Sequence, residues 1–325
     1  MRLIFCADPL GLRPGPLAET GFPHSRSRWS LARPYRRLVD ALYEREAEAA
    51  QQAGLEYTLL NVEALVDEQD ALAATRRIAP AAAPEVGVYR GWMLRPAAYE
   101  RLYEALAALN IFLINMPLAY RHCHYLPESY PVIEGHTPRS IWLKLRDGPS
   151  IEQIMDALQP FGDKPLILKD YVKSRKHEWA EACYIPSAAD RAAVERVVKR
   201  FLELQGPELN EGLVFREFVS FEPLASHAKS GMPLTKEFRI FFLDGERLLT
   251  APYWETGAYG DLLPPADLFQ EVARHVQSRF FTMDVARRVD GAWMIVELGD
   301  GQVAGLPEQA DAGAFYRALA QKIAA

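Results

Sequence analysis

The sequence has few cysteines and no long apolar run, and both absences exclude classes of protein. Its three cysteines, Cys6, Cys123 and Cys183, are far apart and in no spacing typical of a zinc or redox site. Their odd number argues against a disulfide framework, so we expect reduced, buried thiols. No stretch approaches the roughly eighteen consecutive apolar residues of a membrane span. The N-terminal run "MRLIFCADPLG" is too short for a secretory signal. We therefore expect a cytoplasmic protein that does not enter a membrane.

The sequence also lacks a positive charge excess. Its net charge is −6 over 325 residues, which disfavours non-specific binding of nucleic acid. Hydrophobic residues make up 49% and charged residues 25% of the chain, so a disordered or collagen-like protein is excluded. The length is sufficient for two or three domains, each with its own core.

Strand and helix signals alternate over the first part of the chain. Apolar runs predict strands near residues 2–7, 56–62, 85–91 and 111–115, and helical patterns cover residues 33–53 and 96–109. This alternation predicts a βαβ layer with a mainly parallel sheet. Residues 8–28 are rich in Pro, Gly, Ser and Arg and are expected to form a long loop near the carboxyl edge of the sheet. Either a ligand-binding loop or a plain surface loop fits this composition.

The later part of the chain predicts antiparallel sheets with helices packed on them. Strands are expected at residues 137–145, 165–172 and 213–219, and helices at 150–158, 190–204, 265–280 and 310–323. Asp-Gly pairs at 244–245 and 290–291 lie between apolar runs. Such pairs are strong hairpin signals, so we expect one hairpin around each.

The second hairpin carries three carboxylates. Its turn places Asp284 opposite about residue 297, so Asp284, Glu297 and Asp300 are expected to converge on one face. Like charges repel, and oxygen ligands of this kind suit Mg²⁺, which commonly binds one or two carboxylates plus phosphates. Glycines would leave room for a close ligand; they are Gly299, Gly301 and Gly305. The alternative is an exposed strand end with solvated acids.

Basic residues follow the strand that ends at Lys169. Lys173, Arg175, Lys176 and His177 come next, within a predicted loop. Cations at a strand end can neutralise the charge of a triphosphate. A solvated basic surface loop is the alternative reading.

Two arginines, Arg216 and Arg239, occupy otherwise apolar strands. Burying a guanidinium without a partner costs several kcal/mol, so each must face a cleft, an acid or a ligand. We expect the nearby acids Glu217 and Glu237 to point to the opposite sheet faces and so not to be the partners. An anionic ligand and salt bridges to other strands both remain open.

The order of these segments resembles the ATP-grasp ligase superfamily. The matching stretches are "TPRSIWL" at 137–143, "VFREFV" at 214–219, "KEFRIFF" at 236–242, "MDV" at 283–285 and "IVELGDG" at 295–301. They are similar to a divergent branch named for two arginines and a lysine, which includes the eukaryotic factor that helps assemble a translation initiation complex. The resemblance implies α/β and α+β content, with an ATP-grasp fold whose two α+β lobes clasp ATP. It implies a Rossmann-like domain at residues 1–125, a small lobe at 126–220 and a large lobe at 221–325.

The resemblance also implies a role for each matching residue. The phosphates of ATP would be bound by Lys169, with Lys144, Lys173 and Lys176 as further cofactor-binding lysines. The backbone of Glu217, Phe218 and Val219 would meet the adenine, and Glu222 would bind the ribose. Asp284, Glu297 and Asp300 would hold Mg²⁺ or Mn²⁺, and Arg216 and Arg239 would be catalytic. The chain departs from the family in having no glycine in "DYVKSRKHEW" after Lys169, and in having Asp300 where many relatives have asparagine.

The implied function is that of an enzyme. An ATP- and Mg²⁺-dependent ligase would activate a carboxylate as an acyl phosphate, join it to an amine and release ADP; the substrates would be amino acids, a peptide or a protein. The alternative is an ATP-binding assembly factor or chaperone with little or no turnover. A nucleic-acid end-joining enzyme has less support because the chain is acidic. Residues 8–28 and 120–130 are candidate substrate contacts, and we expect His122 and His124 to be a structural pair.

Overall fold

The computed structural model describes residues 1–14, 35–226, 231–255 and 257–324. The chain forms two compact units, Met1–Ile114 with Ala312–Ala325, and Asn115–Asp311. The boundary after Ile114 precedes the expected one at residue 125, and the last helix belongs to the first unit. Within the described ranges, no helix combines the length and the apolar character that a membrane crossing requires.

The first unit contains a mainly parallel sheet. Its strands are β1 (Arg2–Pro14), β2 (Tyr35–Val39), β3 (Tyr57–Leu60), β4 (Glu85–Arg90) and β5 (Ile111–Leu113). The order is β2-β1-β4-β5, with β3 also paired to β1. Strands β3, β1, β4 and β5 run parallel, and β2 is antiparallel to β1. The predicted parallel βαβ layer is therefore confirmed, whereas a Rossmann-like assignment of this unit stays a prediction.

Some helices of the first unit begin at clear capping signals. They are η1 (Ala41–Tyr43), α1 (Glu44–Gln52), α2 (Val62–Val66), α3 (Ala71–Thr75), α4 (Pro96–Ala107) and α11 (Ala312–Ala324). The Asp70 side chain accepts from the Ala73 amide at the start of α3, and Pro96 occupies the first turn of α4. Helix α11 packs against α1. There, Tyr316 donates to Glu46, which is paired with the fully buried Arg90.

Two predictions for this unit need correction. The helix expected over residues 33–53 begins only at Glu44, because Tyr35–Val39 pair with β1 as a strand. The loop expected over residues 8–28 is partly strand, since β1 continues to Pro14. The remainder of that expected loop lies mainly in residues 15–34, outside the described part of the chain.

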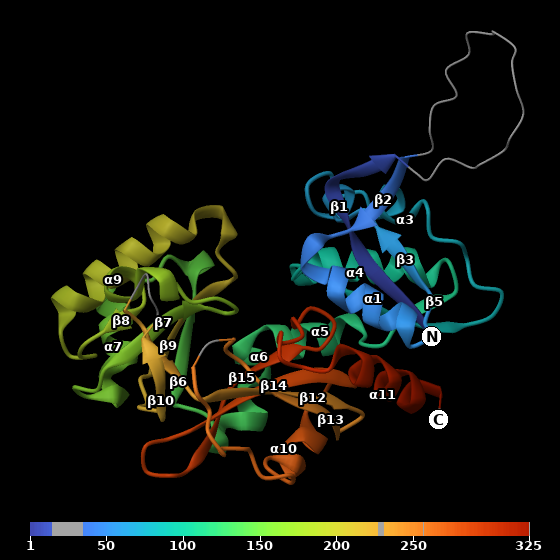
Figure 1. Ribbon diagram of the computed structural model, residues 1–325. Helices are drawn as coiled ribbons and strands as arrows, with labels where there is room; N and C mark the ends of the chain where they lie inside the picture. The colour runs from blue at the N-terminus through green and yellow to red at the C-terminus, as the bar shows by residue number, and fades with distance from the viewer. Residues whose placement is uncertain (15–34, 227–230, 256, 325) are drawn as a thin grey trace, which may run out of the picture. The chain divides into compact units, whose positions relative to one another are not determined.

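The second unit contains two four-stranded antiparallel sheets, of which the first is called the smaller-lobe sheet. Its strands are β6 (Ser140–Lys144), β7 (Leu166–Asp170), β8 (Tyr184–Ile185) and β9 (Gly212–Glu217), in the order β6-β9-β7-β8. Its helices are α7 (Ile151–Leu158), α8 (Trp179–Ala182) and α9 (Arg191–Gln205). Helices α7 and α9 lie on one face of the sheet (Figure 1), where they bury Leu158 and Phe201 with Leu168 and Phe215.

The second sheet of this unit is the larger-lobe sheet. Its strands are β12 (Glu237–Leu243), β13 (Glu246–Pro252), β14 (Phe280–Arg287) and β15 (Trp293–Asp300), in the order β13-β12-β14-β15. Both predicted hairpins are confirmed. Asp244 and Gly245 have φ of +51° and +76°, the left-handed conformations that tight hairpin turns require.

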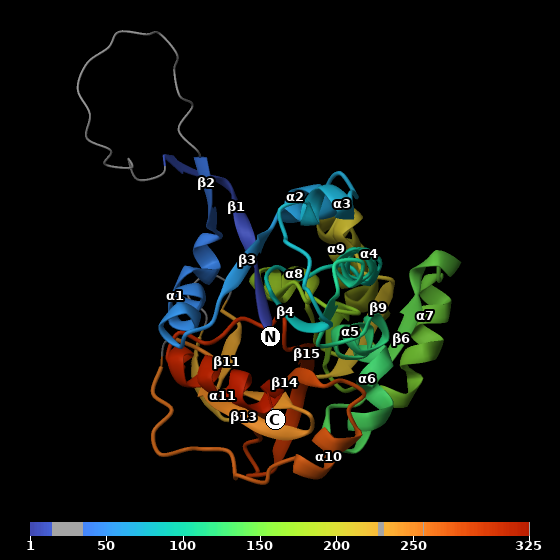
Figure 2. The same ribbon diagram turned by 90° about the vertical axis from the view of Figure 1, so that its right-hand side faces the viewer.

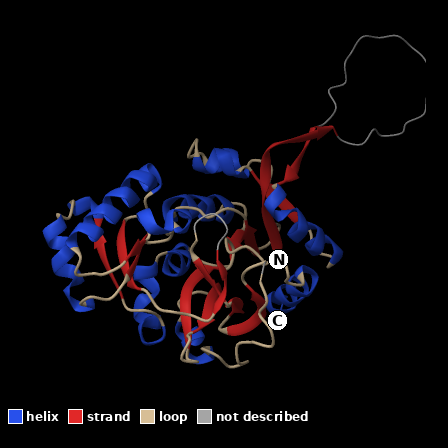
Figure 3. Cartoon of the chain, turned by 60° about the vertical axis from the view of Figure 1, so that its left-hand side comes forward, coloured by secondary structure: helices blue, strands red, loops and turns tan. Residues whose placement is uncertain are grey.

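Helices cover one face of this sheet and leave the other for the polar side chains. Helices α5 (Pro117–His124) and α6 (Leu126–Ile133) lie beside β15 (Figure 2), and α10 (Gln270–His275) packs near α6. In Figure 3 the strands of both sheets of this unit are red and the helices packed on them are blue. Helix α10 is shorter than the expected 265–280, because Phe269 has a φ of +55° and Val276 is extended.

The remaining elements are short. Strands β10 (Pro223–Ser226) and β11 (Pro233–Thr235) form a two-stranded ribbon. The further 3₁₀ turns are η2 (Glu134–His136), η3 (Leu145–Asp147), η4 (Gln159–Phe161), η5 (Lys176–Glu178) and η6 (Gly206–Glu208).

Candidate functional site

Charged side chains form a row across one face of the larger-lobe sheet. Arg239 on β12 is opposite Asp284 on β14, and Asp284 is opposite Glu297 on β15. Residues directly opposite in register share a sheet face. The neighbouring positions Phe238, Val285 and others point to the other face, into the apolar core beneath α6 and α10. The expected pairing of Asp284 with residue 297 is therefore confirmed.

Arg239 and Asp284 form a bidentate ion pair. The guanidinium donates from Nε to Oδ1 at 2.8 Å and from NH2 to Oδ2 at 2.7 Å, and Asp284 is 1% exposed. NH1 of Arg239 donates to the carbonyl oxygen of Gly305, and the guanidinium lies 4.7 Å from the ring centre of Tyr253. Burial raises the pKa of Asp284, although the charge of Arg239 opposes that rise.

The basic residues of the smaller-lobe sheet share one face. Val214 on β9 is opposite Lys169 on β7, Arg216 is two residues further along β9, and Lys144 on β6 is opposite Gly212. The alternation of side chains places all three cations on the face that α7 and α9 leave uncovered.

Lys169 joins this face to the row on the larger-lobe sheet. The lysine is 7% exposed, and its Nζ donates to Oε2 of Glu297 at 3.5 Å. Burial acts to raise the pKa of Glu297, but Lys169, Arg239 and Arg216 outweigh it and the pKa is lowered. Glu297 is therefore an ionised carboxylate set among cations from both sheets.

Arg216 is buried and bonded within the protein. Its NH2 donates to Oγ1 of Thr137 at 2.6 Å and to the carbonyl oxygen of Ile295 at 3.3 Å. Burial lowers its pKa to about 10, and the nearby charge of Glu297 acts against that change. Of the two explanations that the sequence left open for the arginines, a carboxylate partner on another strand holds for Arg239, whereas Arg216 bonds to a hydroxyl and a carbonyl.

Glu237 is the acid that sequence reasoning placed on the wrong face. It is two residues from Arg239, so the two side chains share a face of β12. Burial, with the charges of Asp284 and Glu297, raises its pKa well above the usual range. Strict alternation along β12 was the signal that would have found it.

Asp300 does not join the other two carboxylates. It is opposite Phe281, a residue of the apolar core, and therefore points to the reverse face of the sheet. It is fully buried and accepts from Nδ2 of Asn115 at 2.6 Å and from the amide of Gln302 at 2.9 Å. The expected convergence of three acids needs this correction: residues three apart on a strand face opposite ways. Among the described residues, no three His, Cys, Asp or Glu side chains are grouped to hold a metal.

The glycines after Glu297 have packing reasons. A Cβ on Gly299 would lie 2.8 Å from Oγ1 of Thr282, and one on Gly301 would lie 2.8 Å from the ring of Phe280. Only Gly305 of the three has open space around it. Room for a ligand is therefore not what Gly299 and Gly301 provide.

The residues expected at the adenine and ribose are partly engaged within the protein. The amide of Glu217 donates to the carbonyl oxygen of Arg139, and its carboxylate pairs with Lys164. The amide of Phe218 donates to Pro165, and Val219 is partly exposed. The carboxylate of Glu222 accepts from Arg287 at 2.6 Å. Their nucleotide roles stay predictions.

The other predicted lysines differ in setting. Lys144 and Lys173 are exposed. The Nζ of Lys176 lies 5.1 Å from the ring centre of Trp254, close enough to the acids to affect the pKa of Glu297. Lys176 is thus the lysine of the basic loop that approaches the charged row.

The predicted histidine pair and the three cysteines lie largely inside the protein. His124 stacks on Tyr120, and burial with the nearby charge of Lys173 lowers its pKa to about 4. His122 is buried, and its Nε2 has no hydrogen-bond partner among the described residues. The expectation of free, buried cysteines is confirmed; they are Cys6, Cys123 and Cys183.

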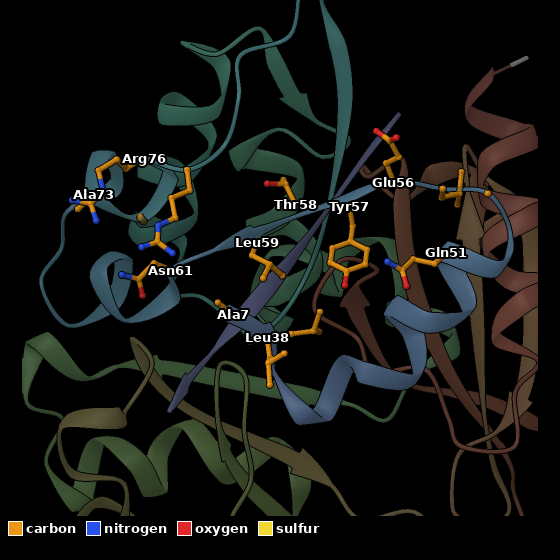
Figure 4. Close-up of a pocket in the computed structure, with 15 residues that line it drawn as sticks. Ala7, Leu38, Gln51, Glu56, Tyr57, Thr58, Leu59, Asn61, Ala73 and Arg76 are labelled. Carbon is orange, nitrogen blue, oxygen red and sulfur yellow. The ribbon is translucent and has the colours of Figure 1, made fainter. Parts of the chain in front are cut away.

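A hollow of about 1060 Å³ lies in the first unit, beside strand β3 (Figure 4). Tyr57, Thr58 and Leu59 line it together with Asn61 and Arg76. None of the residues predicted to bind nucleotide or metal, or to act in catalysis, is among its lining residues. The hollow is therefore separate in sequence and chemistry from the charged row.

Residues 160–319 match the family model described as "ATP-grasp domain, R2K clade family 3". That match spans the charged row and both hairpins. No curated protein matches the sequence.

Solved structures resemble the whole chain. D-cycloserine synthetase DcsG superposes with a TM-score of 0.59 at 14% identity, over 99% of this chain and 100% of that one. ATP-grasp ligase PsnB, complexed with minimal precursor, Mg and ADP, superposes with a TM-score of 0.54 at 13% identity, over 99% of this chain and 98% of that one. The RimK domain protein ATP-grasp from Sphaerobacter thermophilus gives 0.56 at 13%, over 100% of both chains. At such identities the likeness concerns the fold.

Proposed function

From the ATP-grasp fold of this chain, we propose that it is an ATP-dependent carboxylate–amine ligase that works through an acyl phosphate and releases ADP. The observation that carries the proposal is the contact between Lys169 of the smaller-lobe sheet and Glu297 in the row Arg239–Asp284–Glu297. Opposite charges from two sheets meet there, as a site for a metal-bound polyphosphate requires.

Lys169 is the residue proposed to bind the phosphates of ATP. It is almost fully buried, and its one ion pair among the described residues is the long contact with Glu297 at 3.5 Å. A phosphate oxygen offers the ammonium a shorter, charge-assisted bond. Lys176, from the adjoining loop, supplies a second cation, whereas the exposed Lys144 and Lys173 remain weaker candidates.

The residues present fit a magnesium ion bound with the nucleotide. Asp284 and Glu297 are directly opposite each other, and Mg²⁺ commonly takes one or two carboxylates and completes its shell with phosphates and water. Both oxygens of Asp284 accept from Arg239, but a carboxylate has about four acceptor positions. When bound, the ion would neutralise phosphate charge; Mn²⁺ has the same ligand preference.

The proposed reaction has two steps. An oxygen of the substrate carboxylate bonds to the γ-phosphorus while the bond to the bridging oxygen of ADP breaks, and ADP leaves. The amine nitrogen then bonds to the acyl carbon, inorganic phosphate leaves, and the nitrogen loses a proton to water. Arg239, with a guanidinium held rigidly by Asp284, is proposed to stabilise the negative charge of the transferring phosphoryl group. Arg216 adds a fixed positive charge near Glu297, which helps to keep this carboxylate ionised.

We further propose that the chain belongs to the branch named for two arginines and a lysine. Its support is the clade named in the matching family model. The precursor peptide bound in a PsnB structure supports a peptide as the substrate class. The link to the translation-initiation assembly factor stays a prediction from the sequence.

The first experiment is calorimetric binding of a non-hydrolysable ATP analogue with and without Mg²⁺. We expect Mg²⁺-dependent binding that Lys169→Ala weakens by about tenfold or more, because a buried charge-assisted bond is lost. Lys199→Ala, which removes an exposed lysine on α9, is the matched control and should bind as the unmodified protein does. No binding by the intact protein would refute the nucleotide site.

Product analysis then tests the chemistry. With a substrate pool, formation of ADP and phosphate in equal amounts is expected. AMP and pyrophosphate as products would contradict the acyl-phosphate route, since transfer of the γ-phosphoryl group cannot produce them. Tight nucleotide binding without any ADP would favour the assembly-factor alternative.

A further inference from the structure

Glu237 is a buried acid that the proposed phosphate chemistry does not use. The residue is 9% exposed, and among the described residues its carboxylate has no ion pair within 4.0 Å and no hydrogen-bond donor. Arg239 and Lys176 act on it only at longer range. Without a close cation, burial favours the neutral acid. A positively charged ligand within hydrogen-bond distance would stabilise the carboxylate form, so we expect such a ligand at this position.

Aromatic side chains stand beside Glu237 at the end of β13. The amide of Tyr253 donates to the carbonyl oxygen of Glu237 at 2.9 Å, and Tyr253 meets Trp254 edge to face at 4.9 Å. The hydroxyl of Tyr259 donates to the same carbonyl at 2.9 Å and accepts from the Trp254 amide at 3.0 Å. These bonds fix the backbone of Glu237, Tyr253 and Trp254 as one corner.

The indole N–H of Trp254 is a second, independent indication of a ligand site. Its Nε1 is buried, and no described residue accepts a hydrogen bond from it. A buried donor without an acceptor is costly, so the corner combines a donor that needs an acceptor with an acid that has no cation within 4.0 Å among the described residues. A molecule with a cation and an oxygen acceptor would satisfy both.

An ammonium group fits this corner better than a metal ion. An ammonium group donates hydrogen bonds to a single carboxylate, whereas Mg²⁺ requires a shell of oxygen ligands. The N–H of Trp254 cannot ligate a metal, and no described group of three acids, His or Cys is assembled here. Amino acids and peptide N-termini carry both the ammonium and the nearby oxygen.

We propose that Glu237, Tyr253 and Trp254 form the subsite that recognises the acceptor, a primary amine of amino-acid or peptide N-terminal type. The proposal rests on the ligase function above and makes Glu237 a specificity-determining residue. Glu237 bonds to the ammonium group, and the Trp254 N–H bonds to the neighbouring carbonyl oxygen. The subsite lies two residues along β12 from Arg239, on the face that carries the phosphoryl chemistry.

Saturation-transfer NMR with glycinamide at pH 6.5 tests the proposal in the full chain, loaded with Mg²⁺ and the non-hydrolysable ATP analogue. Glycinamide has the ammonium and the carbonyl oxygen, and acetamide lacks the ammonium. We expect a signal from glycinamide that Glu237→Gln weakens by about tenfold, because a charge-assisted bond is lost. Glu246→Gln, the same change at an exposed position of β13, should leave the signal unchanged.

Each other outcome decides the matter. Equal signals from glycinamide and acetamide, or a signal that Glu237→Gln leaves intact, would overturn the amine subsite. Loss of Mg²⁺-dependent nucleotide binding in folded Glu237→Gln would identify a metal ligand instead. If that variant does not fold, Trp254→Leu tests the same subsite at a partly exposed position. It should weaken the binding of glycinamide and leave the binding of the nucleotide unchanged. Failure of the unmodified protein to bind nucleotide refutes the proposed function, whereas nucleotide binding without glycinamide binding refutes only this inference.

Discussion

At the scale of single residues, Asp300 ties the end of β15 to the segment before α5. Its carboxylate accepts hydrogen bonds from Asn115 and Gln302. The Asn115 side chain also donates to the carbonyl oxygen of Phe280 and accepts from the amide of Phe280. These bonds close the end of the larger-lobe sheet. Asp300 therefore supports the row formed by Asp284 and Glu297 without belonging to it.

We predict that Asp300→Ala destabilises the protein by about 2–4 kcal/mol, because buried donors of Asn115 and Gln302 lose their acceptor. Urea unfolding measures this free energy. Asp163→Ala, at an exposed position, is the control and should change it little. Below its melting temperature, Asp300→Ala should still bind the ATP analogue with Mg²⁺; loss of that binding in the folded variant would return Asp300 to the metal site.

At the scale of elements, the hairpin of β14 and β15 depends on an irregularity in its register. Val285 is opposite Ile295, but Asp284 is opposite Glu297, so β15 carries one extra residue. This bulge turns Glu297 toward the side of Asp284. With regular pairing, Val296 would occupy that position and the charged row would be broken.

The tight packing of this hairpin supports a second stability prediction. Gly301→Ala should destabilise the protein by about 1–3 kcal/mol, because its Cβ would press on the ring of Phe280. Gly305→Ala is the matched control, since open space surrounds Gly305. Thermal unfolding compares the two variants. Equal melting temperatures would contradict the prediction, because they would show that the end of β15 accommodates the added Cβ without loss of stability.

At the scale of the whole molecule, the last helix of the chain, α11, belongs to the first unit. Helix α11 packs on α1, where Tyr316 completes the buried pair of Glu46 and Arg90. Two parts of the chain that are far apart in sequence therefore share one core. The first unit depends on residues that follow the entire second unit.

Truncation after Asp311 tests this dependence. We expect the amides of β1, β3 and β4 to lose protection from hydrogen exchange, because Phe315, Tyr316 and Leu319 no longer cover α1. The amides of β12 and β14 should keep theirs. Tyr316→Phe, which removes one hydrogen bond to Glu46, should cost only about 1–3 kcal/mol. Unchanged protection in the truncated chain would show that α11 is dispensable for the first unit.

Local signals in the sequence determined most elements, and the resemblance of five short stretches to a known superfamily indicated the ATP-grasp fold that these elements compose. Asp-Gly pairs placed both hairpins, alternating apolar residues placed the strands of both sheets, and Lys169, Arg239, Asp284 and Glu297 could be chosen from their positions at strand ends and in apolar strands. These features are local because turn conformation and side-chain alternation act over a few residues.

Only the tertiary structure decided which charged residues meet. It brought Asn115 to Asp300, placed Glu237 beside Tyr253 and Trp254, and brought Lys169 to Glu297 across two sheets. It also returned α11 to the first unit. A bulge shifts the face of every residue beyond it, and contacts between distant segments depend on how whole sheets pack, so neither can be read from local sequence.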